Sequence, residues 1–170
     1  MVDIEVVALM VSPVHAYEGR PADGPQPDPV PISRHSVDVR SGLGLVGDRY
    51  YGQPVHRDAA VTFFAAESLD LLELTEPADP LATRRNVVLR GFAIDELART
   101  PQRPGARFSI DCGSGDIEFQ ANRPANPCAW MDVTVGPGAF RGLRGHGGVR
   151  CTPLADGTLR VGPARLTALD

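Results

Sequence analysis

The chain has 170 residues, a hydrophobic content of 42% and a formal net charge of −4. We expect one domain over residues 1–170, because this length supplies one hydrophobic core. The apolar content excludes a chain that is disordered throughout, and the slightly acidic balance argues against a nucleic-acid partner, which usually needs a basic stripe. A total of 18 glycines and 16 prolines favours short strands joined by many turns over a helical bundle.

Short apolar runs predict strands along most of the chain. The first covers residues 4–11, which are rich in β-branched side chains. Five prolines then interrupt residues 19–31, so this segment is predicted to be a long surface loop, either a lid or a tolerated insertion. Further strands are expected at residues 36–39, 61–64 and 86–89. The best helical pattern covers residues 67–74 and ends before Pro77.

Two hairpins are predicted in the second half of the chain. Residues 107–110 and 117–120 flank a glycine-rich turn. Residues 149–154 and 158–161 flank Asp156-Gly157, a pair that suits a turn with positive φ. Six to nine short strands with a few short helices predict a mainly β fold, and specifically a β-barrel.

The cysteine pattern indicates free thiols. Cys112, Cys128 and Cys151 are an odd number, and they form no Cys-x-x-Cys pair or Cys/His comb, which argues against a disulfide framework or a structural zinc site. The start of the chain has no signal-peptide pattern, and no apolar run is long enough to span a bilayer. We therefore expect a cytoplasmic protein without a membrane partner.

Cys128 is the main candidate for chemistry. It follows Asn126-Pro127 and precedes a short polar turn, which is a poor position for core filling. Thiolates act as nucleophiles, sulfur carriers and ligands of soft metals. From the residues alone, a functional thiol and a buried inert thiol remain equal alternatives. For the other two cysteines, a structural role is the preferred interpretation.

Polar residues cluster at three further turn positions. In Gly47-Asp48-Arg49, a carboxylate lies beside a cation, as in a ligand-binding turn or a purely structural one. Arg84-Arg85-Asn86 is typical of a site for phosphate or a planar heterocycle, and solvated arginines paired with nearby acids are the alternative. Arg123 is predicted either to favour the thiolate form of Cys128 or to hold an anion near it. His146 is either a proton donor near Cys128 or simply exposed.

Several short motifs, taken in order, resemble those of MOSC domains of the short stand-alone bacterial type. The family is named for the C-terminal domain of molybdenum-cofactor sulfurase. The resemblance extends over residues 2–169 and depends on the order of the motifs around one cysteine. The motifs are Gly42-Leu43-x-Leu45-x-Gly47-Asp48-Arg49, Arg85-Asn86-Val87 with Gly91, Pro127-Cys128-x-x-Met131-Asp132, Arg144 with Gly147-Gly148-Val149, and Asp156-Gly157-x-Leu159-x-Val161-Gly162.

This resemblance implies a β-barrel with the family's characteristic cysteine at Cys128. In the family, that cysteine is thought to carry sulfur as a persulfide or to ligate molybdenum held by a pterin dithiolene. The resemblance further implies that Arg84, Arg85 or Arg49 holds the phosphate of molybdopterin and that Asn86 faces its pterin edge. Gly47-Asp48-Arg49 is expected to form a glycine-rich turn near the site.

Three functions follow as hypotheses. The first is a molybdenum-cofactor-binding reductase of N-hydroxylated small molecules, with Cys128 as the metal ligand. It needs a separate electron-donor protein, because the chain has no flavin, haem or iron–sulfur motif. The alternative is a metal-free sulfur carrier that receives sulfur from a cysteine desulfurase as a Cys128 persulfide. The third is a non-catalytic binding module. The chain contains no lysine, which excludes a pyridoxal-phosphate Schiff base of its own.

Overall fold

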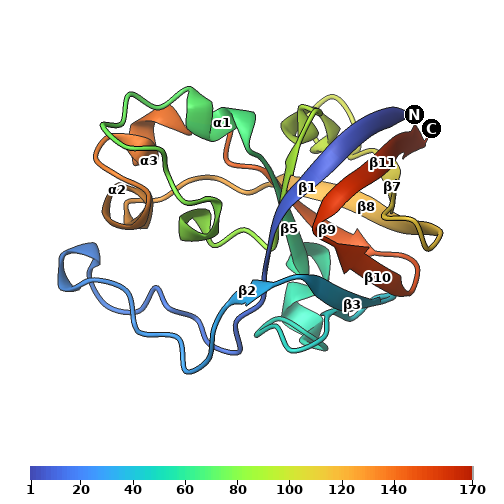
Figure 1. The fold of residues 1–170 in the computed structure, drawn as a ribbon, viewed down its shortest axis with the longest axis horizontal. Coiled ribbons are helices and arrows are strands. Elements are labelled where there is room, and N and C mark those ends of the chain that lie inside the picture. The colour runs from blue at the N-terminus through green and yellow to red at the C-terminus, as the bar shows by residue number, and fades with distance from the viewer. Residues whose placement is uncertain (170) are drawn as a thin grey trace.

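Seven strands form a closed barrel in the computed structural model, which describes residues 1–169 (Figure 1). β11 pairs with β1 and closes the ring, and β5 and β6 run parallel, whereas the other barrel pairs are antiparallel. This confirms the mainly β barrel that the sequence predicts. In order around the barrel, the strands are β1 (Val2–Met10), β6 (Val87–Arg90), β5 (Val61–Ala65), β9 (Val149–Pro153), β8 (Asp116–Pro124), β7 (Arg107–Asp111) and β11 (Gly162–Leu169).

The remaining elements are short. β2 (Ser33–Arg34) pairs with β1, and a second sheet contains β10 (Gly157–Arg160), β3 (Ser36–Arg40) and β4 (Gly44–Leu45). The α-helices are α1 (Glu67–Asp70), α2 (Trp130–Thr134) and α3 (Ala139–Gly142), and the 3-10 helices are η1 (Pro21–Asp23), η2 (Pro54–Ala59), η3 (Pro80–Thr83) and η4 (Ile94–Leu97). None of the helices in residues 1–169 has the length and apolar character that crossing a membrane requires.

Alternating side chains fill the barrel interior. Along β8, Ile117, Phe119 and Ala121 are buried while the residues between them are partly exposed, as the two-residue period of a strand requires. The rings of Phe63, Phe108 and Phe119 meet inside the barrel with centroids 4.9–5.5 Å apart. Aromatic pairs in this range add to the free energy gained by burial.

A second apolar cluster lies outside the barrel, between β5, β6 and the helices. It contains Phe64, Leu69, Val88, Met131 and Leu143. In Figure 1 the three α-helices gather on this side of the barrel. β5 and β6 are therefore buried on both faces, which explains why the sequences of these two strands are continuously apolar rather than alternating.

The predicted second hairpin is wrong. β9 already has β5 and β8 as neighbours, so β10 leaves the barrel and pairs with β3. Gly157 does not take the expected positive φ, and it is the first residue of β10. A Cβ atom there would come within 2.5 Å of Ile117 Cγ1, so glycine is required for close packing.

The predicted helix over residues 67–74 is shorter than expected and ends at Asp70. Leu72 and Leu74 pack instead against glycines of the α2–α3 region: Cβ atoms built on Gly142 and Gly136 would lie 2.5 Å and 2.7 Å from these leucine side chains. Tertiary packing of the two leucines therefore replaces the last helical turns. β11 was not predicted, although it closes the barrel.

Candidate functional site

Cys128 lies in the segment between the end of β8 and the start of α2. Its side chain is exposed, whereas Trp130 and Met131 just after it are buried and anchor α2. The Met131 amide donates to the Cys128 carbonyl at 2.9 Å. The structure thus favours the accessible thiol over the buried one. Cys151 is fully buried and Cys112 is half-buried, in agreement with structural roles.

A cleft of about 330 Å³ opens beside Cys128. Five arginines line it, and no aspartate or glutamate is among its lining residues. Its volume lies at the lower end of the range for small-molecule pockets. The cleft therefore combines a reachable thiol with a strongly cationic wall. The lining residues are His15, Tyr17, Arg49, Tyr50, His56, Ala59, Thr62, Arg84, Arg85, Arg123, Asn126, Cys128, Trp130 and Arg150.

Arg84 and Arg85 point in different directions because Arg84 is in the left-handed region, with φ 52°. It is the one residue other than glycine with positive φ in residues 1–169, a conformation that is costly for a side chain with a Cβ atom. The turn sends Arg84 toward the proline-rich loop and Arg85 toward the segment that carries Cys128. The left-handed conformation of Arg84 therefore lets two adjacent arginines bind partners on different segments of the chain.

The Arg85 guanidinium holds two loops together next to the thiol. Its Nε donates to the Gly147 carbonyl at 2.9 Å, and one terminal nitrogen donates to the Ala125 carbonyl at 2.9 Å. Burial, followed by repulsion from Arg150, lowers the pKa of Arg85 to about 10. The group remains charged at neutral pH, so it is a desolvated cation whose partners are neutral carbonyls.

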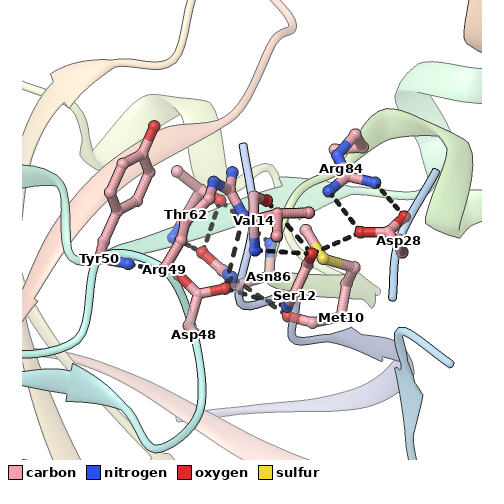
Figure 2. A network of polar contacts seen from close by, with 10 residues as sticks. All are labelled: Met10, Ser12, Val14, Asp28, Asp48, Arg49, Tyr50, Thr62, Arg84 and Asn86. Carbon is pink, nitrogen blue, oxygen red and sulfur yellow. Dashed lines mark hydrogen bonds and ion pairs between the residues drawn. The ribbon is translucent and has the colours of Figure 1, made fainter. Parts of the chain in front are cut away.

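Arg84 is already neutralised. Its two terminal nitrogens donate to the carboxylate of Asp28 at 2.8 Å and 3.0 Å, and the Ser12 hydroxyl also contacts that carboxylate (Figure 2). Asp28 belongs to the proline-rich loop, so this loop is fastened to the cleft rather than free. Tyr17, in the segment just before this loop, provides a second attachment, since its ring stacks on Trp130 with centroids 4.9 Å apart.

Asn86 lies under the cleft and does not line it. Its Nδ2 donates to the Met10 carbonyl and to Asp48 Oδ1, both at 3.1 Å, and its Oδ1 accepts from the Thr62 amide and hydroxyl, both at 3.0 Å (Figure 2). The amide group has no hydrogen bond left for a ligand. The structure therefore does not support the expected contact between Asn86 and a pterin edge. Asn86 instead positions the residues beneath the cleft through these hydrogen bonds.

Asp48 is also buried, and it supports the floor of the site. It accepts from the amides of Ser12 and Tyr50 and from Asn86. Burial raises the pKa of Asp48, and the Arg49 guanidinium opposes that rise. Gly47 forms the preceding turn with φ 91° and does not line the cleft. Within this motif, Arg49 alone faces the site.

Arg49 is incompletely satisfied. Its terminal nitrogen lies 3.5 Å from Asp48 Oδ1, and its guanidinium lies 4.6 Å from the centroid of the Tyr50 ring. Its Nε is buried, and nothing in residues 1–169 accepts a hydrogen bond from it. Because the terminal nitrogen is only weakly paired with Asp48 and the side chain lines the cleft, this guanidinium is suited to an added anion.

Arg123 and Arg150 supply the remaining positive charge. Neither forms an ion pair with a carboxylate in the described chain, and the same holds for Arg85. Burial and the neighbouring Arg123 lower the pKa of Arg150. Three uncompensated guanidinium groups around one cleft repel one another, and an anion would relieve that repulsion.

Sequence reasoning missed several lining residues. His15 and Tyr17 come from the segment before the proline-rich loop, His56 from η2 and Arg150 from β9. Burial and the nearby arginines lower the pKa of His15, which is therefore neutral near pH 7. No local motif signals these residues, because the barrel brings together segments that are far apart in sequence.

His146 is not near Cys128 in the cleft. It lines a different cavity, together with Asp95. The reason is the Gly145–Gly148 loop, whose Gly147 and Gly148 pack so closely that Cβ atoms would come within 2.2 Å of the Ala125 and Phe63 carbonyl oxygens. This packing turns the His146 side chain to the other side of the loop. A proton-donor role next to Cys128 is thus not supported.

Comparison with known proteins defines the fold. No protein-family model matches the chain, and no curated protein matches its sequence. The YuaD protein from Bacillus subtilis superposes with a TM-score of 0.70 over 100% of both chains, at 13% identity. YiiM from Geobacillus stearothermophilus superposes with a TM-score of 0.59 at 19% identity, covering 98% of this chain and 75% of YiiM.

A further crystal structure, of a hypothetical protein, gives a TM-score of 0.54 at 17% identity over 98% of this chain and 68% of its own. At these identities the likeness concerns the fold alone. The chain is therefore a mainly β protein with a closed seven-stranded barrel and a few short helices, as its sequence predicts.

Proposed function

We propose that the cleft beside Cys128 binds a molybdenum cofactor and that the protein reduces N-hydroxylated small molecules. The observation that carries this proposal is the exposed thiol in a cleft with five arginines and no carboxylate among its lining residues. The barrel fold and the MOSC-like motifs around Cys128 support it as well.

The donor set fits such a cofactor. Molybdenum accepts soft thiolate ligands, and Cys128 offers one. The phosphate of molybdopterin is a dianion that Arg85, Arg123 and Arg150 are suited to hold, because their charges have no carboxylate partner in residues 1–169. Arg84 contributes less than the sequence predicts, since Asp28 occupies both of its terminal nitrogens.

Other residues of the chain shape access to the thiol. The stacked Tyr17 and Trp130 rings form an apolar wall of the cleft beside Cys128 and keep water from that side. Bound molybdenum would supply two-electron redox and oxygen-atom chemistry, which the protein side chains lack. The electrons would come from a separate donor protein.

Metal and pterin analysis tests this proposal directly. After expression in a host that makes the cofactor, we expect molybdenum and pterin in near-equal amounts per chain. Cys128→Ser should lose most of the metal, because a hydroxyl is a poor ligand for a soft metal. Cys112→Ser is the matched control and should retain it. Absence of both metal and pterin from the unmodified protein would contradict the proposal.

A metal-free sulfur carrier is the second candidate. The exposure of Cys128 favours it, because an enzyme that donates sulfur must reach the acceptor thiol. Incubation with a cysteine desulfurase and cysteine should then add one sulfur atom to the intact mass. The gain should be reversed by a reducing thiol and should be absent from Cys128→Ala.

A further inference from the structure

A second cavity, of about 660 Å³, lies on the other side of the Gly145–Gly148 loop from the Cys128 cleft. The loop touches both regions: the Gly147 carbonyl accepts from Arg85, and the Gly148 amide donates to Asp95 at 2.7 Å. Much of the cavity wall is apolar, with Ala65, Leu71, Phe92 and Ala93 among its lining residues.

The charged groups of this cavity are mostly acidic. Glu67, Asp95 and Glu96 line it, and no lysine or arginine does, so His146 is the only basic side chain among its lining residues. Asp95 is half-buried, and burial raises the pKa of its carboxyl group. The electrostatic character of the cavity is thus opposite to that of the Cys128 cleft.

Glu67 is the most informative residue of the cavity. Its Oε1 accepts from the Gly91 amide at 2.7 Å, which fixes the carboxylate in place. Its Oε2 is buried and has no donor in residues 1–169. An acceptor that is buried without a donor is destabilising, and a carboxylate oxygen more so than a neutral one. The carboxylate of Glu67 therefore has one protein donor, the Gly91 amide, in residues 1–169.

A candidate partner within the chain, Arg90, is already engaged. Arg90 is close enough for its charge to interact with Glu67, but its guanidinium is bound to Asp70 through contacts of 2.7 Å and 3.3 Å. Asp70 and Arg90 are both exposed, so this pair forms at the surface and leaves the cavity acidic.

We propose that this cavity, hereafter the Glu67 cavity, binds a small organic cation that has an apolar body and an N–H donor directed at the Glu67 carboxylate. The apolar wall would hold the body of the ligand, and the three carboxylates would favour its positive charge. Charge-assisted hydrogen bonds to a carboxylate are stronger than neutral ones, so a protonated amine or amidine is the preferred donor.

Benzylamine is a suitable probe, because it carries a protonated amine on a small apolar ring. In a titration of the isotope-labelled full chain followed by amide chemical shifts, we expect saturable changes in residues 65–71, 91–96 and 145–148. The dissociation constant should be about 1 mM, as is typical for so small a ligand. Benzyl alcohol, the neutral match, should bind about tenfold more weakly.

Glu67→Gln tests the carboxylate itself. The variant keeps an acceptor for the Gly91 amide, and it should reduce benzylamine affinity about tenfold, to the level of benzyl alcohol. Glu73→Gln makes the same charge change on an exposed residue outside the cavity, and it should leave the affinity unchanged. If Glu67→Gln fails to fold, Leu71→Lys replaces it, since Leu71 is 63% exposed and a cation there should abolish binding.

Three outcomes would overturn the proposal. They are equal affinity for benzylamine and benzyl alcohol, unchanged benzylamine binding in the Glu67→Gln or Leu71→Lys variant, and shift changes that fall outside the three segments. Because Cys128 takes no part in this site, Cys128→Ser should bind benzylamine like the parent. The result is therefore independent of whether the protein binds molybdenum.

Discussion

The Cys128 cleft and the Glu67 cavity are neighbours with opposite chemistry. Five arginines line the first, and three carboxylates line the second. The Gly145–Gly148 loop separates them, with Arg85 bound to one side of it and Asp95 to the other. The loop can lie between the two sites because its glycines, which have no side chain, allow the backbone to approach the Ala125 and Phe63 carbonyls closely.

This contrast shows why the overall charge says little about a site. A chain with a net charge of −4 still concentrates uncompensated guanidinium groups in one cleft. Four of its other arginines form ion pairs in residues 1–169, among them Arg107 with Glu118 and Arg165 with Asp111. The character of each site is set by the charged side chains that have no partner there, and not by the net charge of the chain.

The largest expected effect concerns the reactivity of the three thiols. At pH 8 with a limited amount of iodoacetamide, we expect Cys128 to react at least about a thousandfold faster than Cys151, which is fully buried and must wait for the fold to open. Burial raises the pKa of Cys151 well above its ordinary value, and that adds to the difference. Peptide mass analysis after different reaction times measures the rates.

Cys112 provides the internal control for this measurement. It is half-buried, and burial raises its pKa, so it should react about tenfold more slowly than Cys128. Equal rates at all three cysteines would mean that the protein is unfolded under the conditions used. If Cys128 reacted with iodoacetamide as slowly as Cys151 in the folded protein, the result would contradict an accessible thiol in an open cleft.

A second, smaller effect is expected from the proline-rich loop. Asp28→Asn removes the charge that neutralises Arg84, and the free energy of unfolding should fall by about 2 kcal/mol at pH 7. Asp23→Asn, in the same loop and at an exposed residue without a side-chain hydrogen bond or ion pair in residues 1–169, is the matched control. Urea titration of both variants and the parent gives the difference.

The pH dependence of this difference has a definite sign. The bonds from Arg84 hold the pKa of Asp28 below its ordinary value of 3.8. The Asp28 carboxylate therefore stabilises the folded state above the unfolded pKa, and that contribution is lost as the pH falls through the folded pKa. The gap between parent and Asp28→Asn should be full at pH 7 and should close below about pH 3.8. A gap that stays constant on acidification would contradict the ion pair.

Much of the fold could be predicted from local sequence patterns. β-branched and apolar runs give β1, β5 and β6, and the glycine-rich turn after residue 111 gives the β7–β8 hairpin. The Asp156-Gly157 turn was misassigned because local turn chemistry does not reveal that β9 already has two neighbours. β11 was missed because it pairs with β1 and β7, which are distant in sequence.

The candidate site was predicted in part. Cys128, Arg49, Arg84, Arg85 and Arg123 do line one cleft. What the sequence did not reveal is which of these charges remain free: Asp28 neutralises Arg84, and Asn86 and Asp48 satisfy each other beneath the cleft. These ion pairs and hydrogen bonds depend on loop conformation, including the left-handed turn at Arg84, and no local sequence pattern predicts them.

The central claim is that a reachable thiol lies in a cleft that attracts anions. The most direct test compares the rates at which Cys128 reacts with iodoacetate, an anion, and iodoacetamide, its neutral analogue. Relative to the same ratio for glutathione, the iodoacetate rate should be raised several-fold at low salt and should fall as salt is added. Arg123→Gln and Arg150→Gln should each lower the ratio, whereas Arg141→Gln, outside the cleft, should not. A ratio equal to that of glutathione at every salt concentration would contradict the account.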